Sequence, residues 1–277
     1  MARRIDSHHH VWEIARGDYA WLTPEYSAKL MYDFGPQDMD PLMAECGMEA
    51  SVLVQCARTL AETRYILAVA AQTEFIEAVV GWADIAREDA IDSLAEFAEN
   101  PLFRGIRPTM MDFEDLTWLN GDNQRRALEE MSRLGLVFDA LVLPHHLDDL
   151  RDAMLAHPDL GVVINHFAYP DIADGDISGW RESMAAIARD TSACVKFSGI
   201  MVGLGADRPA EDYRPAADHL LEHFGPQRLL WGSDWPNLLA DSDYLTWYAL
   251  GERLLEGTSE ADRDWIYGGT AARVYRI

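Results

Sequence analysis

Short apolar segments rich in β-branched residues alternate with longer helical patterns along the whole chain. This alternation constrains the fold more than any other feature of the sequence. We expect eight strands, near residues 4–7, 50–55, 78–82, 103–107, 135–139, 161–165, 193–198 and 228–232. Most of these segments are almost continuously apolar, which is typical of strands buried on both faces, as in a parallel sheet.

The segments between these strands carry apolar residues at helical spacing. Helices are expected at 88–99, 122–134, 147–156, 179–190, 210–224 and 242–255. Eight strands that alternate with helices in 277 residues predict an α/β protein with a single (β/α)8 TIM barrel domain over residues 1–277. A doubly wound open sheet is the alternative, but no G-x-G-x-x-G phosphate loop follows the first strand to support it.

Charge and composition exclude several classes of function. The chain has 47 acidic and 23 basic residues, a formal net charge of −24, and such a surface repels nucleic acid backbones. No run of about 18 uncharged apolar residues occurs, so we expect no membrane span. Cys46, Cys56 and Cys194 are odd in number and widely spaced, which favours a reduced, cytoplasmic setting.

Polar residues follow almost every predicted strand. In a (β/α)8 barrel the active site lies at the carboxyl ends of the strands. His8 and His10 follow the first strand, and in extended backbone they project to one face while His9 projects to the other. The remaining strand ends deliver Gln55, Arg107, Asp139 with His145 and His146, Asn165 with His166, Lys196 with Ser198, and Asp234. The sequence therefore predicts a pocket lined by histidine, arginine and aspartate.

This set of residues permits hydrolysis at a carbonyl by two routes. His8, His10, His166 and Asp234 could hold one divalent metal ion, zinc above all, with an open position for water. Without a metal, the same imidazoles could bind a developing oxyanion while Asp234 accepts a proton from water. Arg107 is suited to a substrate carboxylate through a bidentate pair.

The candidate substrate-binding residues are Arg107, His146, Trp12, Trp82 and Tyr169. The tryptophans flank predicted strand ends and could stack on a ring, although aromatic residues in such places are more often packing. His146 follows Pro144 and could instead cap a helix. Asp234 has an ordinary alternative as well, because an aspartate in Gly-Ser-Asp-Trp-Pro can form an Asx-turn or a helix cap.

Several segments together resemble a known family. They are Ile-Asp-Ser-His-His-His-Val-Trp-Glu at 5–13, Phe-Arg-Gly-Ile-Arg at 103–107, Gly-Ser-Asp-Trp-Pro at 232–236 and Gly-Thr-Ala-Ala-Arg-Val-Tyr at 269–275. The chain resembles the lactonase-type amidohydrolases (the amidohydrolase-2 group) over nearly its whole length. That group includes the sugar lactonases for fuconolactone and rhamnonolactone and the hydrolases of pyrone dicarboxylate and sulfomuconolactone.

The resemblance implies a distorted barrel and a lactone-opening reaction. It implies that His8, His10 and His166 polarise the lactone carbonyl, directly or through a divalent ion, since members differ in their use of zinc. It also implies that Asp234 is the general base and Arg107 a substrate anchor. Residues 165–170 read Asn-His-Phe-Ala-Tyr-Pro, where many sugar lactonases read Asp-His-Leu-Gly-Lys-Pro. This difference keeps the histidine but weighs against the usual sugar lactone.

We therefore expect a hydrolase that opens the lactone of a sugar acid or of an aromatic-catabolism product. A decarboxylase or a lactone isomerase on the same barrel is the first alternative, and product analysis separates these reactions. A barrel that binds a small acid without turnover is the second. The combined presence of a carbonyl polariser and a base argues against that second alternative. A homodimer is compatible with the sequence but not required by it.

Overall fold

Eight parallel strands form one sheet in the order β1 to β8 in a computed structural model, which describes residues 3–112, 115, 117–173, 175–204 and 208–277. The strands are β1 (Ile5–His9), β2 (Ala50–Val54), β3 (Ile76–Gly81), β4 (Phe103–Ile106), β5 (Val137–Ala140), β6 (Gly161–Ile164), β7 (Cys194–Phe197) and β8 (Leu229–Trp231). The sheet closes just beyond β8: the His10 amide donates to the Trp235 carbonyl (2.7 Å) and the Asp234 amide to the His8 carbonyl (2.8 Å). The predicted (β/α)8 barrel is confirmed.

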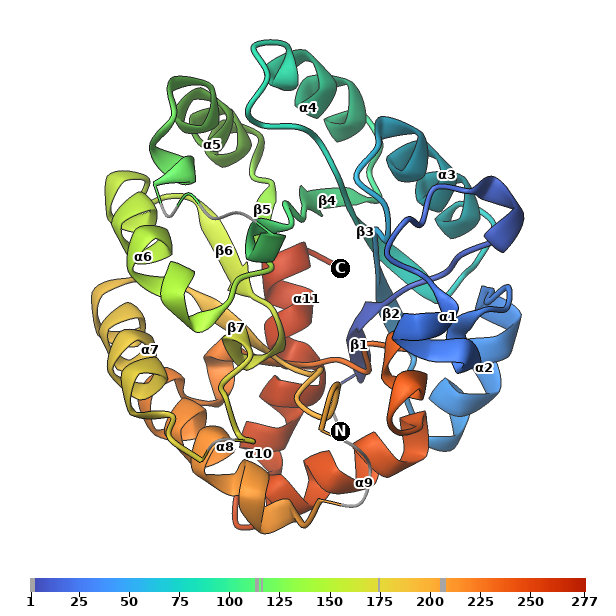
Figure 1. Cartoon of the computed structure of the whole chain (residues 1–277), viewed down its shortest axis with the longest axis vertical. Coiled ribbons are helices and arrows are strands. Elements are labelled where there is room, and N and C mark those ends of the chain that lie inside the picture. Colours follow the sequence, from blue (N-terminus) through green and yellow to red (C-terminus); the bar gives the residue numbers. More distant parts are fainter. Residues whose placement is uncertain (1–2, 113–114, 116, 174, 205–207) are drawn as a thin grey trace.

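Helices surround the strands, as Figure 1 shows, and α11 crosses the middle of the ring in that view. The α-helices are α1 (Pro24–Ser27), α2 (Pro36–Glu45), α3 (Leu60–Ala70), α4 (Ala90–Ala98), α5 (Asp122–Leu134), α6 (Leu147–Ala156), α7 (Ser178–Asp190), α8 (Ala210–Phe224), α9 (Tyr244–Leu254), α10 (Glu260–Asp264) and α11 (Thr270–Tyr275). Shorter helical turns are η1 (Ile14–Arg16), η2 (Ala28–Leu30), η3 (Met110–Asp112), η4 (Trp118–Asn120), η5 (Pro144–His146), η6 (His166–Ala168), η7 (Pro226–Arg228), η8 (Asn237–Ala240) and the π-helical η9 (Trp265–Gly269). No helix among the described residues is long and apolar enough to cross a membrane.

The predicted helices all occur, and α5, α6 and α8 begin and end at the expected residues. Gly135 ends α5 in a left-handed conformation (φ 66°), which a glycine adopts without steric cost. The expectation did not include α1, α2, α3, α10 or α11. A cap that can be read in the sequence starts α3, because Thr59 accepts a hydrogen bond from the amide of Glu62.

The inside of the barrel is filled at its amino-terminal end. Inward-facing residues such as Val52, Val80 and Leu230 pack there against Ala271 and Tyr275 of α11. Each apolar side chain of this size contributes about 1.5–3 kcal/mol when it is fully buried. Since α11 closes this end, the open space of the barrel lies at the carboxyl ends of the strands.

Two turns at that end hold non-glycine residues in the left-handed region. The four residues from His166 to Tyr169 all have positive φ, and Asp234 has φ 60°. Such conformations cost about 1–3 kcal/mol each and persist where the surrounding structure dictates them. Gly199 faces the first turn, and a Cβ on it would lie 2.4 Å from His166 Nδ1. Only glycine therefore leaves room for the His166 ring.

Candidate active site

Asp234 stands at the centre of three imidazoles. Its Oδ1 lies 3.3 Å from His10 Nε2, 3.5 Å from His8 Nε2 and 3.7 Å from His166 Nε2. All four side chains are buried. They come from the end of β1, from η6 after β6 and from the turn after β8, so closing the barrel brings together the four residues that the sequence singled out.

His9 points away from this group. Its Nε2 lies 2.9 Å from the Ser51 hydroxyl on β2, on the opposite face of β1. This is the alternation that extended backbone imposes on successive side chains. The strand register assumed for His8 and His10 is therefore the one that the structure has.

Hydrogen bonds on the far side of each ring fix the orientation of His10 and His166. His10 Nδ1 lies 2.8 Å from the Val54 carbonyl. Because a carbonyl only accepts, Nδ1 of His10 carries the proton and its Nε2 is bare. His166 Nδ1 lies 2.9 Å from the Ser198 hydroxyl, which can donate or accept.

Burial sets the charges of the group. It lowers the pKa of His8, with the cationic Lys196 as the next cause, and it lowers that of His166 to about 4. Burial would raise the pKa of Asp234, but attraction to His166 and His10 and a hydrogen bond from Asn237 hold it at about 2. At neutral pH an ionised carboxylate therefore faces neutral imidazoles.

One oxygen of Asp234 is held by protein and the other is left open. Asn237 Nδ2 donates to Oδ2 (3.0 Å), and the side-chain oxygen of Asn237, Oδ1, in turn accepts from the Tyr26 hydroxyl (2.9 Å). Oδ1 of Asp234 is buried and has no hydrogen-bond partner among the described residues. A buried unpaired acceptor costs about 1–3 kcal/mol, more if charged. This oxygen is therefore placed for something outside the protein, such as a water, a substrate or a metal ion.

The same atoms fit a divalent metal ion. The ligand atoms of His8, His10 and Asp234 all lie within 4.8 Å of one another and are buried. Imidazole nitrogen with carboxylate oxygen is the donor set of catalytic zinc sites. His166 lies beside this trio through the 3.7 Å approach of its Nε2 to Asp234.

A cavity of about 600 Å³ opens above the group, within the range of small-molecule sites. Its lining includes His10, His166 and Asp234 at the floor, with Gln55, Arg107, Thr109, Tyr169, Asn237, Trp21, Tyr26, Arg58, Asp18 and Asp112 around them. Arg107 and Tyr169 thus lie where the sequence analysis put them. His8 lies beneath the floor, in contact with His10 (Nε2 to Nε2, 3.1 Å).

Arg107 is partly committed to the protein. Its Nη2 donates to the Gln55 carbonyl (2.5 Å), and its Nη1 lies 3.3 Å from His8 Nε2. Its Nε is buried, and no residue in the described part of the chain pairs with it. The guanidinium therefore braces β2 against β4 as well as facing the cavity, and its role as a substrate anchor stays a prediction.

The other three candidate substrate contacts lie outside the cavity. Trp12 is fully buried, with its Nε1 donating to the Tyr32 carbonyl (2.8 Å). Trp82 borders a separate cavity of about 300 Å³. His146 is buried at the start of α6, where its Nδ1 accepts the Leu143 amide (3.2 Å). Trp12 is therefore a buried packing residue, Trp82 belongs to a separate cavity, and His146 caps a helix.

Trp21 and Tyr26 supply the aromatic wall that sequence reasoning missed. They are 38% and 46% exposed and contact each other edge to face (5.6 Å between centroids). Both lie in the long connection after β1, which folds over the strand ends. Trp21 sits there because its Nε1 donates to the Cys56 carbonyl (2.8 Å). The segment Tyr-Ala-Trp-Leu at 19–22 was the available signal.

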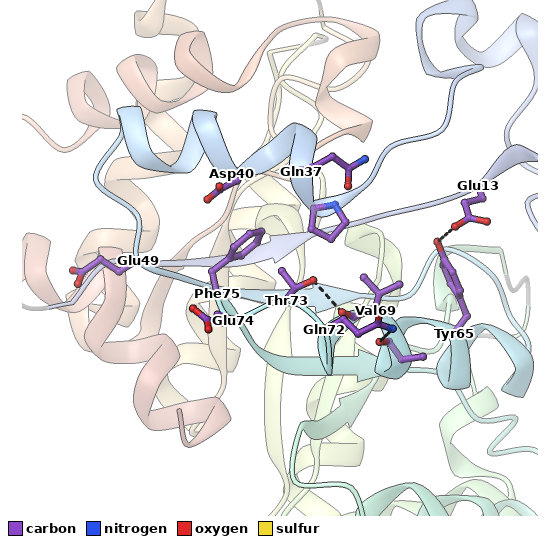
Figure 2. Close-up of a pocket in the computed structure, with 12 residues that line it drawn as sticks. Glu13, Gln37, Asp40, Glu49, Tyr65, Val69, Gln72, Thr73, Glu74 and Phe75 are labelled. Atoms are coloured by element: carbon purple, nitrogen blue, oxygen red, sulfur yellow. Dashed lines mark hydrogen bonds between the residues drawn. The ribbon is translucent and has the colours of Figure 1, made fainter.

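A larger open groove of about 1080 Å³ lies elsewhere, on the outside of the barrel between α2 and α3. Figure 2 shows its acidic lining, with the Tyr65 hydroxyl directed at Glu13 (3.3 Å). None of the residues that line it is a histidine, a lysine or an arginine. The chemistry is therefore assigned to the smaller cavity, where unpaired and ionisable groups converge.

Comparison with known proteins agrees with this geometry. The family model described as Amidohydrolase matches residues 5–277. The chain belongs to this amidohydrolase family. It is 38% identical to an L-fucono-1,5-lactonase of Burkholderia ambifaria, over 100% of this chain and 97% of that protein. It is also 32% identical to an L-fucono-1,5-lactonase of Burkholderia multivorans, with the same coverage.

Solved structures share the barrel fold of this amidohydrolase. A crystal structure of an amidohydrolase from Burkholderia multivorans with bound zinc superposes with a TM-score of 0.93, at 32% identity and with 100% of both chains covered. A 2,6-dihydroxybenzoate decarboxylase superposes with a TM-score of 0.69 at 14% identity, over 100% of both chains. The decarboxylase likeness concerns the fold alone.

Proposed function

We propose that this amidohydrolase opens the ring of an uncharged sugar-acid lactone by adding water to its carbonyl. The proposal depends on one observation above all: Asp234 presents a buried, unpaired oxygen to three imidazoles at the floor of the cavity. An ionised carboxylate in that place accepts a proton from water as the water oxygen bonds to the carbonyl carbon. The ring C–O bond then breaks, and the leaving ring oxygen takes the proton back from Asp234.

The carbonyl oxygen needs groups that stabilise its developing negative charge. Arg107 lines the cavity wall and carries N–H donors, and His166 lines the floor, where its Nε2 is a donor when the Ser198 hydroxyl donates to its Nδ1. Donors directed at a developing oxyanion in a buried site lower the barrier by several kcal/mol. A divalent ion, zinc in our proposal, would be held by His8, His10 and Asp234 with His166 beside them. When bound, it would polarise the carbonyl as a Lewis acid.

The charge of the cavity favours a neutral substrate. Arg58 and Arg107 are its cations, and Arg58 is already paired with Asp112 (2.5 Å). Asp18, Asp112 and Asp234 oppose them. Asp18 is paired with Arg16 (2.5 Å), so the lining carries no excess of positive charge, which disfavours a dicarboxylate. Sugar rings bind through hydroxyl groups and a less polar face, and the exposed aromatic wall suits that face.

The difference from sugar lactonases at residues 165–170 fits this view. Asn165 does not line the cavity; its amide donates to Asp139 inside the barrel. Tyr169 does line it, where the family pattern has a lysine. A neutral side chain at this position makes the cavity less cationic. The change therefore bears on which lactone fits and leaves the hydrolytic group untouched.

A panel of substrates tests the proposal. The purified protein is mixed with L-fucono-1,5-lactone, other sugar-acid lactones, a pyrone dicarboxylate and 2,6-dihydroxybenzoate, with and without a chelator, and proton release and products are followed. We expect acid release from sugar lactones well above spontaneous hydrolysis, with weak activity on the dicarboxylate. Release of carbon dioxide from the aromatic acid, or isomerisation without ring opening, would contradict it.

Two further expectations stay predictions: that the chain works as one domain and that it is cytoplasmic. A homodimer stays compatible with the sequence but not required by it. The cysteines, all free and buried, are compatible with a reducing compartment.

A further inference from the structure

Lys196 is buried directly beneath the active site, in the middle of β7. Its side chain is fully inaccessible and does not line the cavity. Its Nζ lies 3.0 Å from His8 Nδ1 and 2.9 Å from Asp139 Oδ2. No step of the reaction proposed above uses it.

An ion pair anchors this lysine. Asp139 Oδ2 accepts from Lys196 and from the Tyr275 hydroxyl of α11 (2.9 Å), and its Oδ1 accepts from the Asn165 amide. A carboxylate with this many donors is a fixed acceptor, and a lysine ammonium beside it has protons to give and no lone pair. The remaining hydrogen-bond contact of Lys196, to His8, is therefore a donated hydrogen bond.

That contact decides where His8 carries its proton. A neutral imidazole has one N–H and one lone pair. If Nδ1 accepts from Lys196, the proton sits on Nε2, which lies 3.1 Å from His10 Nε2 and 3.5 Å from Asp234 Oδ1. His10 can accept it, because the Val54 carbonyl holds the His10 proton on Nδ1.

A neutral His8 ring has one lone pair, so it cannot accept a hydrogen bond from both Lys196 and Arg107. Nη1 of Arg107 lies 3.3 Å from His8 Nε2, and donating there would require the His8 proton on Nδ1. An N–H of His8 would then face the ammonium of Lys196 at 3.0 Å, with no acceptor between them. The Nη1 protons of Arg107 are therefore left for the cavity.

We infer that Lys196 is a positioning residue that directs a hydrogen-bond chain from its Nζ through His8 and His10 to the Val54 carbonyl. The chain makes His8 a donor and His10 an acceptor at the centre. A metal ion on His8 Nε2 would have to displace the proton that Lys196 holds there, so Lys196 also weakens metal binding. The catalytic part of this inference rests on the proposed lactone hydrolysis; the tautomer and the metal affinity do not.

The tautomer can be observed directly in the wild-type protein. Long-range ¹H–¹⁵N spectra of protein labelled at histidine, prepared without metal, distinguish protonated from bare ring nitrogens, and a His8→Gln variant assigns the His8 signals. We expect the His8 proton on Nε2 and the His10 proton on Nδ1. A proton on Nδ1 of His8 would overturn the inference.

The second test removes the lysine without leaving Asp139 as an unpaired buried charge. The double variant Lys196→Met/Asp139→Asn deletes both charges, and Tyr275→Phe is the matched control, because it removes the other donor to Asp139 Oδ2. Competition with a coloured chelator measures zinc affinity. We expect tighter zinc binding in the double variant, because an imidazole nitrogen must be free of its proton to bind the metal, and no change in Tyr275→Phe. Weaker or unchanged binding in the double variant would contradict the inference.

Kinetics on the sugar lactone, run without metal, supply the third readout. We expect kcat of the double variant to fall about 10- to 100-fold with KM nearly unchanged, since Lys196 does not touch the cavity. An unchanged kcat would remove the positioning role. If no lactone is turned over by the wild type, the proposed function fails, while the spectra and the zinc affinity still decide the inference.

Discussion

Asp234 Oδ1 lies 3.3 Å from Nε2 of His10, although the two residues belong to the last and the first strand connections of the barrel. The backbone holds them there, because the Asp234 amide donates to the His8 carbonyl and the His10 amide to the Trp235 carbonyl. The bonds that close the barrel are thus the bonds that assemble the site. The candidate catalytic group is therefore complete only when the barrel has closed.

The orientation of Asp234 depends on Asn237. Asn237→Ala removes the donor to Oδ2 (3.0 Å), so the carboxylate is free to rotate. A hydrogen bond to a charged group is worth about 1.5–3 kcal/mol, so we expect a loss of about 10- to 100-fold in kcat. Tyr26→Phe, which loses only the bond to the Asn237 carbonyl, should cost less. An Asn237→Ala enzyme as active as the wild type would show that Asp234 is held by other contacts.

The pH profile follows from the two shifted groups. Asp234, with a pKa of about 2, is ionised and His166, with a pKa of about 4, is neutral throughout the range above about pH 5. Activity should therefore be level from pH 5 to 7.5 and fall only as the pH drops through about 4. Measuring kcat/KM by product analysis over this range checks it. An acid limb near pH 6.5 would mean that His166 titrates at its ordinary value.

Acid should destabilise the fold through His9. Burial lowers the pKa of His9 to about 3, whereas an unfolded histidine titrates near 6.5. Between these values the unfolded state binds more protons, so stability is complete above about pH 6.5 and is lost as the pH falls toward 3. Titration of this one group lowers the free energy of unfolding by about 2 kcal/mol between pH 7.5 and 5.

Urea unfolding at pH 7.5 and pH 5 measures that loss. A His9→Gln variant should lose less stability between the two pH values than the wild type does. His223→Gln, on the exposed surface of α8, is the control and should behave as the wild type. Equal losses in the wild type and His9→Gln would remove His9 from the account.

Alanine substitutions at two glycines distinguish the effect of backbone strain from the effect of displacing His166. Gly199 and Gly203 have φ values of 65° and 79°, so alanine at either costs about 1–2 kcal/mol of stability. A Cβ at Gly203 meets nothing within 4 Å, whereas one at Gly199 lies 2.4 Å from His166 Nδ1. Gly199→Ala should therefore lose at least about tenfold in kcat, with Gly203→Ala nearly unchanged. Similar kcat values for both variants would show that the His166 position is not critical.

The sequence was sufficient wherever local rules decide the outcome. The alternation of strand side chains placed His8 and His10 together and His9 apart, and the left-handed Gly135 ended α5 at the expected residue. The parallel order of eight strands then put Asp234 beside them. These features depend on periodicity and on the closure of the barrel.

The rest depends on contacts that no local pattern encodes. Tyr26 meets Asn237 across 211 positions, and Lys196 meets His8 across 188. Trp12 looked like a wall of the pocket, but the chain turns back at Phe34 and buries it, with Phe34 stacking edge to face at 5.4 Å. The conformation of a long connection depends on its contacts with distant parts of the chain, so a local sequence pattern does not predict it.

The most direct test of the account is the turnover of L-fucono-1,5-lactone by Asp234→Asn, measured beside lactone binding by calorimetry. Removing the general base should lower kcat by about 10²–10⁴-fold, while the dissociation constant stays within a few-fold of the wild-type value. Turnover at the wild-type rate, or loss of binding that alone explains the loss of activity, would contradict the assignment of Asp234 as the base.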